Sequence, residues 1–390
     1  MAMDIYRYVS LANVKTIGAK FCRPGQLSAA PWMVQLAFLL SIQTPVVNFA
    51  NAGNNCTLFP GTELLDCPQL EEDILTCQST YGKTILLSIG GATYTEGGFP
   101  SEASAIAAAN NIWAMFGPVQ TDSGVNRPFG NAVIDGFDFD FESTVSNMIP
   151  FGQQLRSLMN SVGGKPYYLT AAPQCPYPDA ADGPMLAGQV YFDAVLVQFY
   201  NNYCGVQSYV AGASTQNNFN FDTWDNWAHT VSLNPDVKVL LGVPGSPSAA
   251  GSGYLSASAL APVISYCQDS FSSFGGVMTW DMSQVFYTNP GWLDGVTSDL
   301  QAGSGSGPPP PPPPPPTSIL TTTTITPTTL STITTKVPPT TTTNPTTPCA
   351  TLVPEYSQCG GNGYTGCTQC VAPYSCIPNS VWWSQCGVAS

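Results

Sequence analysis

A chain of 390 residues exceeds the usual size of one domain, so we expect more than one folded unit. The formal net charge is -14 with only 10 Lys and Arg, which excludes a nucleic-acid partner because phosphate binding needs clustered cations. No apolar run reaches the roughly 20 residues that cross a membrane, and the single histidine excludes a multi-histidine zinc site. We expect this residue, His229, on the surface of a helix.

The cysteines bear on the compartment of the protein. Six of the 13 fall within the last 42 residues without metal-ligand spacing, which is typical of an oxidising environment. The N-terminus MAMDIYRYVS has an early Asp4 and lacks the apolar segment of a secretory signal peptide. These observations conflict, and we give more weight to the cysteines. We therefore expect an extracellular, secreted protein, although no signal peptide is visible in this chain.

Short β-rich apolar runs alternate with helix-like stretches over about the first 300 residues. The first run, IYRYVSL at 5–11, is a weak candidate, so closure of a barrel at that strand stays open. Such alternation predicts a parallel α/β fold with a sheet buried on both faces, and eight strands would make a (β/α)8 TIM barrel. The other candidate strands are 33–40, 83–90, 133–142, 167–173, 194–200, 237–244 and 275–282. The clearest candidate helices are 101–116, 149–162 and 256–267.

Composition changes sharply after residue 302. There GSGSG leads into an unbroken run from Pro308 to Pro316, followed by a tract of Thr, Ser and Pro that ends near Pro348. No core can form from these residues, and the prolines favour an extended polyproline II spacer. We therefore predict three parts: a barrel domain at 1–302, a disordered Pro/Thr-rich linker at 303–348 and a small disulfide-stapled β module at 349–390.

The most informative segment is DGFDFDFE at 135–142. On a strand, alternate side chains share a face, so Asp138, Asp140 and Glu142 project one way and three phenylalanines the other. Like charges inside a barrel cannot all ionise, so such a row is costly unless function needs it. The alternatives are an acidic surface strand or a calcium site. Calcium-binding loops contain a sharp turn at a glycine, unlike a straight strand. Glu142, nearest the carboxyl end of the strand, is the candidate general acid.

The segment DGFDFDFE resembles the DGxDxDxE signature of family-18 glycoside hydrolases, and SIGG at 88–91 is similar to their SxGG strand. Three further stretches resemble the class III, hevamine-like chitinases of plants and fungi, and the resemblance covers residues 33 to 300. The chain departs from these relatives at its start, where their YWGQ-like first strand is missing. The three stretches are LTAAPQCPYPD from Leu169, VQFYNN from Val197 and VMTWDMS from Val277.

The resemblance implies a retaining mechanism without an enzymic nucleophile. Glu142 would protonate the glycosidic oxygen while the substrate's own N-acetyl carbonyl attacks C1. Asp140 would accept the acetamido N–H and Asp138 would share a proton with Asp140, while Tyr200 would donate a hydrogen bond to the attacking carbonyl. No cofactor and no metal are implied.

The resemblance also implies a substrate-binding set around that centre. Trp280 would form the floor beneath the distorted sugar, and the peptide bond from Trp280 to Asp281 is expected to be cis. Gln198, Asn201 and Met278 would line the same subsite. Trp280 and Tyr200 could instead be barrel-filling residues, and Asp135 is expected to be structural.

The C-terminal stretch YSQCGGNGYTG from Tyr356, together with WWSQC from Trp382, resembles the fungal-type family-1 carbohydrate-binding module. A unit this small needs covalent staples to fold. The resemblance implies that Tyr356, Trp382 and Trp383 form a flat aromatic face that stacks on sugar rings, with Gln385 beside it. Zinc binding is the alternative use of the cysteines. The implied disulfides are Cys359–Cys376 and Cys370–Cys386, with Cys349–Cys367 as a third.

We also predict the disulfides of the first domain. The pair Cys175–Cys204 follows two consecutive strands, whose loops are neighbours in a barrel. The other expected pairs are Cys22–Cys77 and Cys56–Cys67, which leaves Cys267 free.

These features favour a monomeric endochitinase whose partner is chitin or a related insoluble polysaccharide. An endo-β-N-acetylglucosaminidase acting on N-glycans shares the signature, but a module for insoluble polymers argues against it. A non-catalytic chitin-binding lectin is a second alternative, although such relatives usually lack the glutamate that Glu142 supplies. A structural wall protein is a weaker alternative that the linker alone suggests.

Overall fold

The computed structural model describes residues 8–12, 33–121, 124–303, 352–353, 358–360, 367–378 and 384–387. The chain divides into two compact units. The larger comprises Ala2–Ser306, and the smaller comprises Gly307–Ser390 together with Met1. Among the helices of these described ranges, none combines the length and apolar character that a membrane crossing requires.

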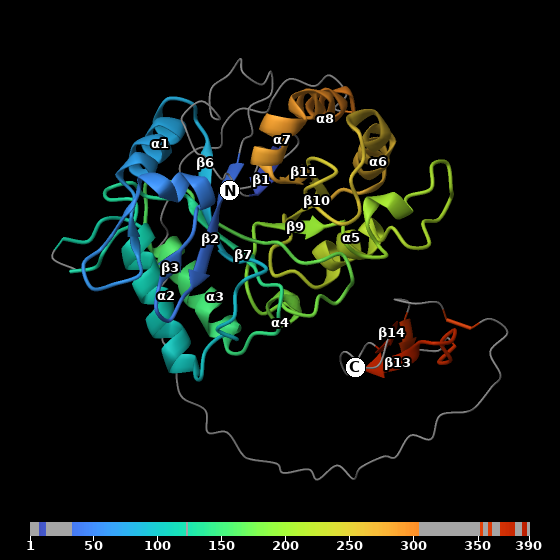
Figure 1. The fold of residues 1–390 in the computed structure, drawn as a ribbon, viewed down its shortest axis with the longest axis horizontal. Helices are drawn as coiled ribbons and strands as arrows, with labels where there is room; N and C mark the ends of the chain where they lie inside the picture. Colours follow the sequence, from blue (N-terminus) through green and yellow to red (C-terminus); the bar gives the residue numbers. More distant parts are fainter. Residues whose placement is uncertain are drawn as a thin grey trace, which may run out of the picture. The chain divides into compact units, whose positions relative to one another are not determined.

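The larger unit is built on a nine-stranded sheet in which eight strands run parallel and β3 (Val46–Val47) lies antiparallel to β2. The strands from 33 onward occur where the apolar runs predict them. Figure 1 shows the strands in the centre with helices around them. The eight parallel strands are β1 (Tyr8–Ala12), β2 (Met33–Ser41), β6 (Thr84–Gly90), β7 (Gly136–Asp140), β8 (Tyr168–Ala171), β9 (Ala194–Gln198), β10 (Lys238–Pro244) and β11 (Phe274–Trp280).

The weak N-terminal candidate does supply the missing strand. β1 pairs in parallel with β11, from Tyr8 opposite Gly276 to Ala12 opposite Trp280, and also with β2. The sheet therefore has no free edge at this point and closes into the (β/α)8 barrel. The lack of the relatives' first-strand motif does not prevent closure, because strand pairing uses backbone groups that any sequence provides.

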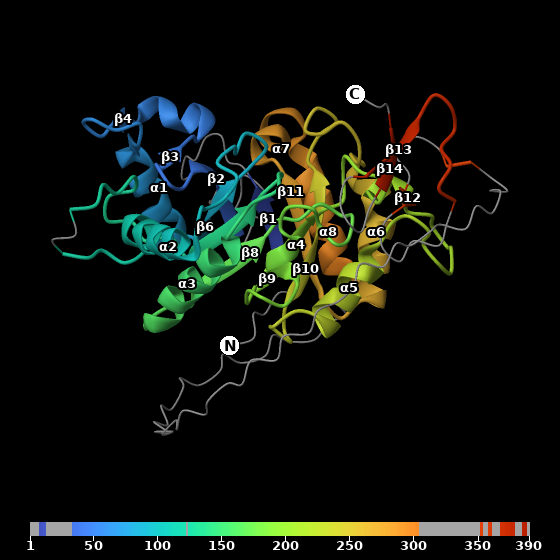
Figure 2. The same ribbon diagram turned by 90° about the horizontal axis from the view of Figure 1, so that it is seen from below.

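Helices follow most strands and cover the outside of the barrel (Figures 1 and 2). The predicted helices at 101, 149 and 256 are all present. Ser101 starts α2 with a capping box, and the Ser256 side chain accepts a hydrogen bond at the start of α6. The helices are α1 (Pro68–Ser79), α2 (Glu102–Phe116), α3 (Met148–Ser161), α4 (Gly183–Leu186), α5 (Phe221–Thr230), α6 (Ala257–Ser270), α7 (Met282–Thr288) and α8 (Pro290–Gly303).

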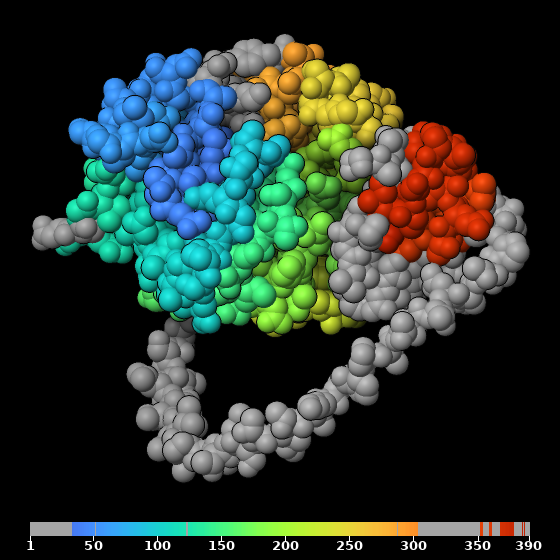
Figure 3. Space-filling model, turned by 60° about the horizontal axis from the view of Figure 1, so that its bottom comes forward, coloured from blue at the N-terminus to red at the C-terminus, as the bar shows by residue number. Residues whose placement is uncertain are grey.

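Short elements decorate the barrel. The strands β4 (Thr57–Leu58) and β5 (Leu65–Asp66) form a separate hairpin, and two 3-10 helices lie at η2 (Ala50–Asn55) and η3 (Val206–Ser208). Residues coloured from blue through green to yellow lie side by side in Figure 3, so segments distant in the sequence together form the face shown. His229 lies exposed on α5, as expected, and its ring contacts the Asp225 carbonyl and the Ser272 hydroxyl.

The core has two layers, because alternate strand residues face opposite sides of the sheet. Between sheet and helices lie the three phenylalanines of β7 and its continuation, with Phe137 near Trp113 of α2 and Phe139 near Phe151 of α3. The inner layer is smaller. It contains Ala172, Ala194, Leu196, Leu240 and Met278.

The catalytic-signature strand begins with two structural residues. Asp135 accepts hydrogen bonds from Lys165 Nζ at 2.7 Å and from the Ile85 backbone N–H at 2.7 Å. Gly136 has φ 149°, and a Cβ placed there would lie 1.8 Å from the Tyr168 carbonyl oxygen. Only glycine fits this close approach of β7 to β8.

The disulfides of the barrel unit agree with the expected pairs as far as they are described. Cys56–Cys67 and Cys175–Cys204 are present, and Cys267 is free and buried. Cys77 is also disulfide-bonded, whereas its expected partner Cys22 lies outside the described residues.

The smaller unit contains an antiparallel sheet in the order β12 (Gln358–Gly360), β14 (Ser384–Gly387) and β13 (Ser375–Pro378). The expected disulfides Cys359–Cys376 and Cys370–Cys386 are present. Cys367 is disulfide-bonded, and its expected partner lies outside the described residues. The backbone of Gln385 belongs to β14. The expected partner, Cys349, and the three expected aromatic residues, Tyr356, Trp382 and Trp383, all lie outside the described part.

Candidate active site

A polar layer crosses the barrel interior at the middle of β7. Strand register places Asp138 between Ser88 of β6 and Thr170 of β8. Ser88 Oγ donates to Asp138 Oδ2 at 2.7 Å, and Thr170 Oγ1 donates to Asp138 Oδ1 at 2.5 Å. Asp138 is thus buried with both oxygens satisfied.

Asp140 lies one layer higher, at the carboxyl end of β7. Its side chain is buried, and Gln198 Nε2 of β9 donates to Asp140 Oδ1 at 2.9 Å. Its backbone oxygen accepts from the Gly91 N–H at 2.7 Å, while a Cβ on Gly90 would lie 2.4 Å from the same oxygen. The glycines of the SIGG segment therefore let β6 approach the catalytic-signature strand closely.

Glu142 follows the end of β7, and its side chain is exposed, so it can reach a ligand at the mouth of the barrel. The pKa of Glu142 is raised, first by partial desolvation and then by the charge of Asp179. A carboxyl group that holds its proton and reaches the surface can act as a general acid.

The two buried carboxyls also favour the neutral form. Burial raises the pKa of Asp138 despite the hydrogen bonds from Ser88 and Thr170. The pKa of Asp140 is raised well above its ordinary value, first by burial and then by the charges of Glu142 and Asp138. This carboxyl row therefore favours states in which at least one of its members is protonated.

Tyr200 is buried two residues beyond β9. Its phenol pKa is raised well above the ordinary value by burial, and further by the charges of Asp140 and Glu142. Tyr200 is thus held as a neutral hydroxyl that can donate a hydrogen bond.

Trp280 ends β11, and its side chain is half-buried. Its ring stacks against Phe38 of β2 with centroids 5.8 Å apart and planes at 26°. The peptide bond from Trp280 to Asp281 is cis, as predicted, and Ala37–Phe38 is also cis. The arrangement leaves part of an aromatic ring available at the mouth.

Two known protein families match parts of the chain. Residues 41–253, which include the carboxyl row and the SIGG segment, match the glycosyl hydrolases family 18. The chain belongs to glycosyl hydrolase family 18. Residues 355–383 of this family-18 protein match the fungal cellulose binding domain.

Two curated relatives cover most of the family-18 chain. A class III chitinase of Arthroderma benhamiae is 51% identical over 313 residues, which are 77% of this chain and 94% of the relative. Endochitinase 33 of Trichoderma harzianum is 53% identical over 270 residues, which are 69% of this chain and 82% of the relative. Family membership identifies the chain as a glycoside hydrolase.

Solved structures of the family-18 fold are also similar. The ICChI chitinase from Ipomoea carnea is 26% identical with a TM-score of 0.59, covering 75% of this chain and 98% of its own. The xylanase and alpha-amylase inhibitor protein XAIP-II from Scadoxus multiflorus is 28% identical with a TM-score of 0.57, covering 77% of this chain and 99% of its own. One of these proteins is named a chitinase and the other an inhibitor. Because both share the fold, the fold alone does not determine activity, which depends on the site residues.

Three further residues expected at the site have more specific positions than the family-18 resemblance implies. Gln198 Nε2 is hydrogen-bonded to Asp140 and to the Ala172 carbonyl, so it orients Asp140. Asn201 has φ 57°, and its Oδ1 accepts the backbone N–H of Gly251 at 2.8 Å. Met278 is almost fully buried and fills the barrel below the site.

Sequence reasoning missed two carboxyl groups, Asp179 and Asp182, in the loop after β8. Both are buried near the carboxyl row, with which they interact electrostatically. Asp179 ends the stretch LTAAPQCPYPD that resembles the class III chitinases, which was a usable signal, whereas Asp182 carries none. Thr170 was also missed.

No metal site competes with this assignment in the described part of the family-18 chain. The one group of three ligand side chains close enough to hold an ion is Cys359, Cys370 and Cys386. Their sulfurs are in disulfides, so they offer no thiolate to a metal.

Proposed function

We propose that the protein is an endochitinase that hydrolyses β-1,4-linked N-acetylglucosamine polymers with retention. The observation that carries this proposal is the carboxyl row of β7, with exposed Glu142 above buried Asp140 and Asp138. The two relatives named as chitinases, one of them an endochitinase, support the same substrate class.

In the first step, Glu142 donates its proton to the glycosidic oxygen as the bond from that oxygen to C1 breaks. The carbonyl oxygen of the substrate's own acetamido group forms a bond to C1, which gives an oxazolinium ion. Asp140 accepts the acetamido N–H and stabilises the positive charge, with a proton shared with Asp138. The Tyr200 hydroxyl donates a hydrogen bond to the attacking carbonyl.

In the second step, the Glu142 carboxylate removes a proton from water as the water oxygen attacks C1. The bond between C1 and the acetamido oxygen breaks, and Glu142 recovers its proton. Two inversions at C1 give net retention. No enzymic nucleophile and no cofactor take part.

The remaining site residues shape the subsite for the reacting sugar. We propose that Trp280 provides the ring beneath that sugar, because it is half-buried at the end of β11. Gln198 and Asn201 line the subsite while holding Asp140 and a neighbouring loop. Met278 supports the subsite from below.

Two other functions are less well supported. A non-catalytic binder, such as a lectin, shares the fold but would not need an exposed glutamate whose pKa is raised by its surroundings. An endo-β-N-acetylglucosaminidase would use the same carboxyls, but the match of 355–383 to a cellulose binding domain favours an insoluble polymer.

Hydrolysis of soluble chitin oligomers, followed by NMR of the new reducing end, tests the proposal. We expect the β-anomer to appear first and the α-anomer only as mutarotation proceeds, because retention preserves the configuration at C1. Initial release of the α-anomer would contradict substrate-assisted catalysis. Absence of hydrolysis would favour the lectin.

We further propose the division into a catalytic domain at 1–302, a linker at 303–348 and a carbohydrate-binding module at 349–390. The separation of the chain into two compact units supports it. The disulfides in both units support an extracellular location, where they are stable. We also expect the protein to be a monomer.

Removal of residues 349–390 is expected to leave turnover of soluble oligomers unchanged and to slow hydrolysis of insoluble chitin by about tenfold. The reason is that tethering raises the local concentration of the catalytic domain at the solid surface. Release of soluble sugars from chitin particles measures the effect, with the Trp382→Ala, Trp383→Ala double variant as a full-length comparison. Loss of soluble activity as well would mean that the two units do not act independently.

A further inference from the structure

Two carboxyl groups near the active site lie outside the catalytic-signature strand. Asp179 and Asp182 belong to the loop between β8 and α4, and their side chains are 8% and 0% exposed. Nothing in the mechanism above uses either residue. Buried carboxyls beside an active site need an explanation, because burial disfavours their charge.

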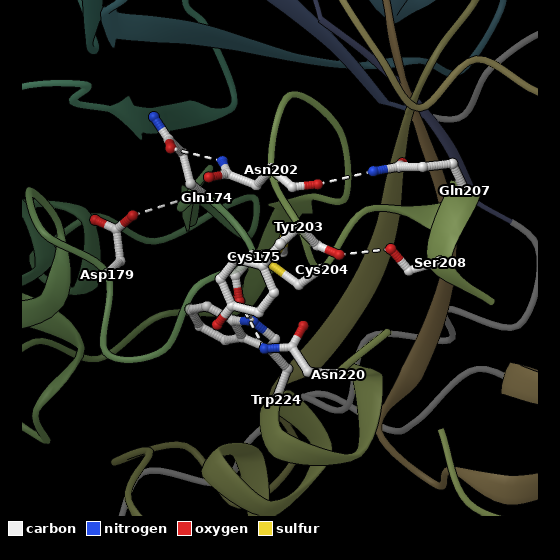
Figure 4. Close-up of a disulfide and its surroundings, with 10 residues drawn as sticks. All are labelled: Gln174, Cys175, Asp179, Asn202, Tyr203, Cys204, Gln207, Ser208, Asn220 and Trp224. Carbon is white, nitrogen blue, oxygen red and sulfur yellow. Dashed lines mark hydrogen bonds between the residues drawn. A yellow bond between two sulfur atoms is a disulfide. The ribbon is translucent and has the colours of Figure 1, made fainter. Parts of the chain in front are cut away.

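The loop that carries them is tied firmly to the neighbouring strand. The disulfide Cys175–Cys204 joins the loops after β8 and β9, and the Cys175 N–H donates to the Gln198 carbonyl at 3.2 Å. The Gln174 side chain accepts a hydrogen bond from Asn202 Nδ2 at 2.9 Å. Figure 4 shows Gln174 between Asp179 and Asn202, with dashed bonds to both.

The same loop packs beside the segment that follows Glu142. Ala181 and Met185 line one cavity together with Val145 and Met148, which come from the segment just after the general acid. The start of the loop is therefore anchored to β9 and the loop after it, and its other end lies across a small cavity from the chain beyond Glu142. Asp179 is held in place relative to the catalytic residues.

The surroundings of the two carboxyls assign them different charges. Asp179 accepts the backbone N–H groups of Ala181 at 2.8 Å, of Asp182 at 2.6 Å and of Gln174 at 3.0 Å. Three such donors stabilise a carboxylate. Neither side-chain oxygen of Asp182 has a hydrogen-bond partner, so this fully buried group favours the neutral acid.

Electrostatics support the same assignment. Burial raises the pKa of Asp179, but its backbone hydrogen bonds oppose that rise. The pKa of Asp182 is raised well above its ordinary value by burial and then by the charge of Asp179. The larger rise at Asp182 favours the proton on Asp182 and the negative charge on Asp179, as in other pairs whose environments differ.

No described cation pairs with these groups. Among the described residues, Arg156 pairs with Asp193, Lys165 with Asp135 and His229 with Asp225, so these three cations contact other carboxyls. The charge of Asp179 therefore acts on the remaining titratable groups of the site without an ion-paired counter-charge. Those groups are Asp140 at the carboxyl end of β7, Glu142 just beyond it and Asp182 in the same loop as Asp179.

We propose that Asp179 is a positioning residue whose negative charge favours the protonated form of Glu142. Asp182 beside Asp179 keeps its own proton and stays neutral. The inference rests on the proposed function, because it matters only if Glu142 is the general acid. As pH rises, Asp179 ionises first. Because its negative charge disfavours a second charge nearby, Glu142 loses its proton only at a higher pH. Activity thus extends further toward neutral pH than an isolated glutamate would allow.

The full chain with Asp179→Asn, compared with Asp182→Asn, tests the proposal. Asp179→Asn removes a charge, so the alkaline limb of the kcat profile on soluble chitin oligomers should move to lower pH. The ratio of kcat at pH 7.5 to kcat at pH 5 should fall by about threefold or more. Asp182→Asn replaces one neutral group by another and should leave this ratio within about twofold of the unmodified protein. KM should change little in either variant.

A direct titration keeps the proposal testable if a variant folds poorly or hydrolysis is absent. The chain has only seven glutamates, so carboxyl carbon-13 NMR can follow Glu142, which is assigned by its loss in Glu142→Gln. We expect its titration to move to lower pH in Asp179→Asn and to show coupling to a second group in the unmodified protein. A Glu142 titration that is unchanged by Asp179→Asn and uncoupled in the unmodified protein would overturn the proposal. An equal shift in Asp182→Asn would overturn the charge assignment.

Discussion

Replacing Glu142 with glutamine is expected to lower kcat on soluble chitin oligomers by about a hundredfold or more, with little change in KM. Glutamine has nearly the shape of glutamate but cannot donate the proton that the glycosidic oxygen requires, and general acids commonly contribute this much. The exposed position of Glu142 means that the substitution removes chemistry and not packing. Steady-state kinetics at several pH values measure the effect.

The matched control is Glu102→Gln, which makes the same change at an exposed position in the first turn of α2. We expect this variant to keep kcat unchanged. Both variants should bind insoluble chitin as well as the unmodified protein, because adhesion is assigned to residues 349–390. Full activity in Glu142→Gln would require the assignment of DGFDFDFE as the catalytic strand to be abandoned.

Replacing Gly136 with alanine is expected to lower the free energy of unfolding by about 3 kcal/mol or more, since backbone strain and overpacking add at one site. The φ of 149° is unfavourable for a side chain, and the new Cβ would meet the Tyr168 carbonyl at 1.8 Å. Because Gly136 starts β7, the displacement would also reach Asp138 and Asp140. Thermal and urea unfolding measure stability, and oligomer hydrolysis at low temperature measures the effect on the site.

Gly291→Ala is the control for that change. Gly291 lies exposed in α8, where a Cβ would have no atom within 4 Å. Alanine there should be neutral or stabilise by about 0.4 to 1 kcal/mol, because it reduces the freedom of the unfolded chain. Equal stability of Gly136→Ala and the unmodified protein would show that β7 and β8 can separate without cost.

The sequence alone was sufficient where the pattern is local. Alternation in DGFDFDFE determines that three carboxyls share one face of β7, because the two-residue period of a strand leaves no other arrangement. The apolar runs from 33 onward likewise located the remaining barrel strands. The pairing of Cys175 with Cys204 follows from the neighbouring loops of consecutive strands, whose order in a barrel is set by the chain.

Only the tertiary structure decided features that depend on contacts between distant segments. Closure by β1 rests on backbone pairing with β11 and β2, which no side-chain pattern encodes. The use of Gln198 to orient Asp140 and of Asn201 to hold a loop could not be read from residue type. The different charges of Asp179 and Asp182 depend on which backbone N–H groups surround each carboxyl, and the path of the folded loop determines those surroundings.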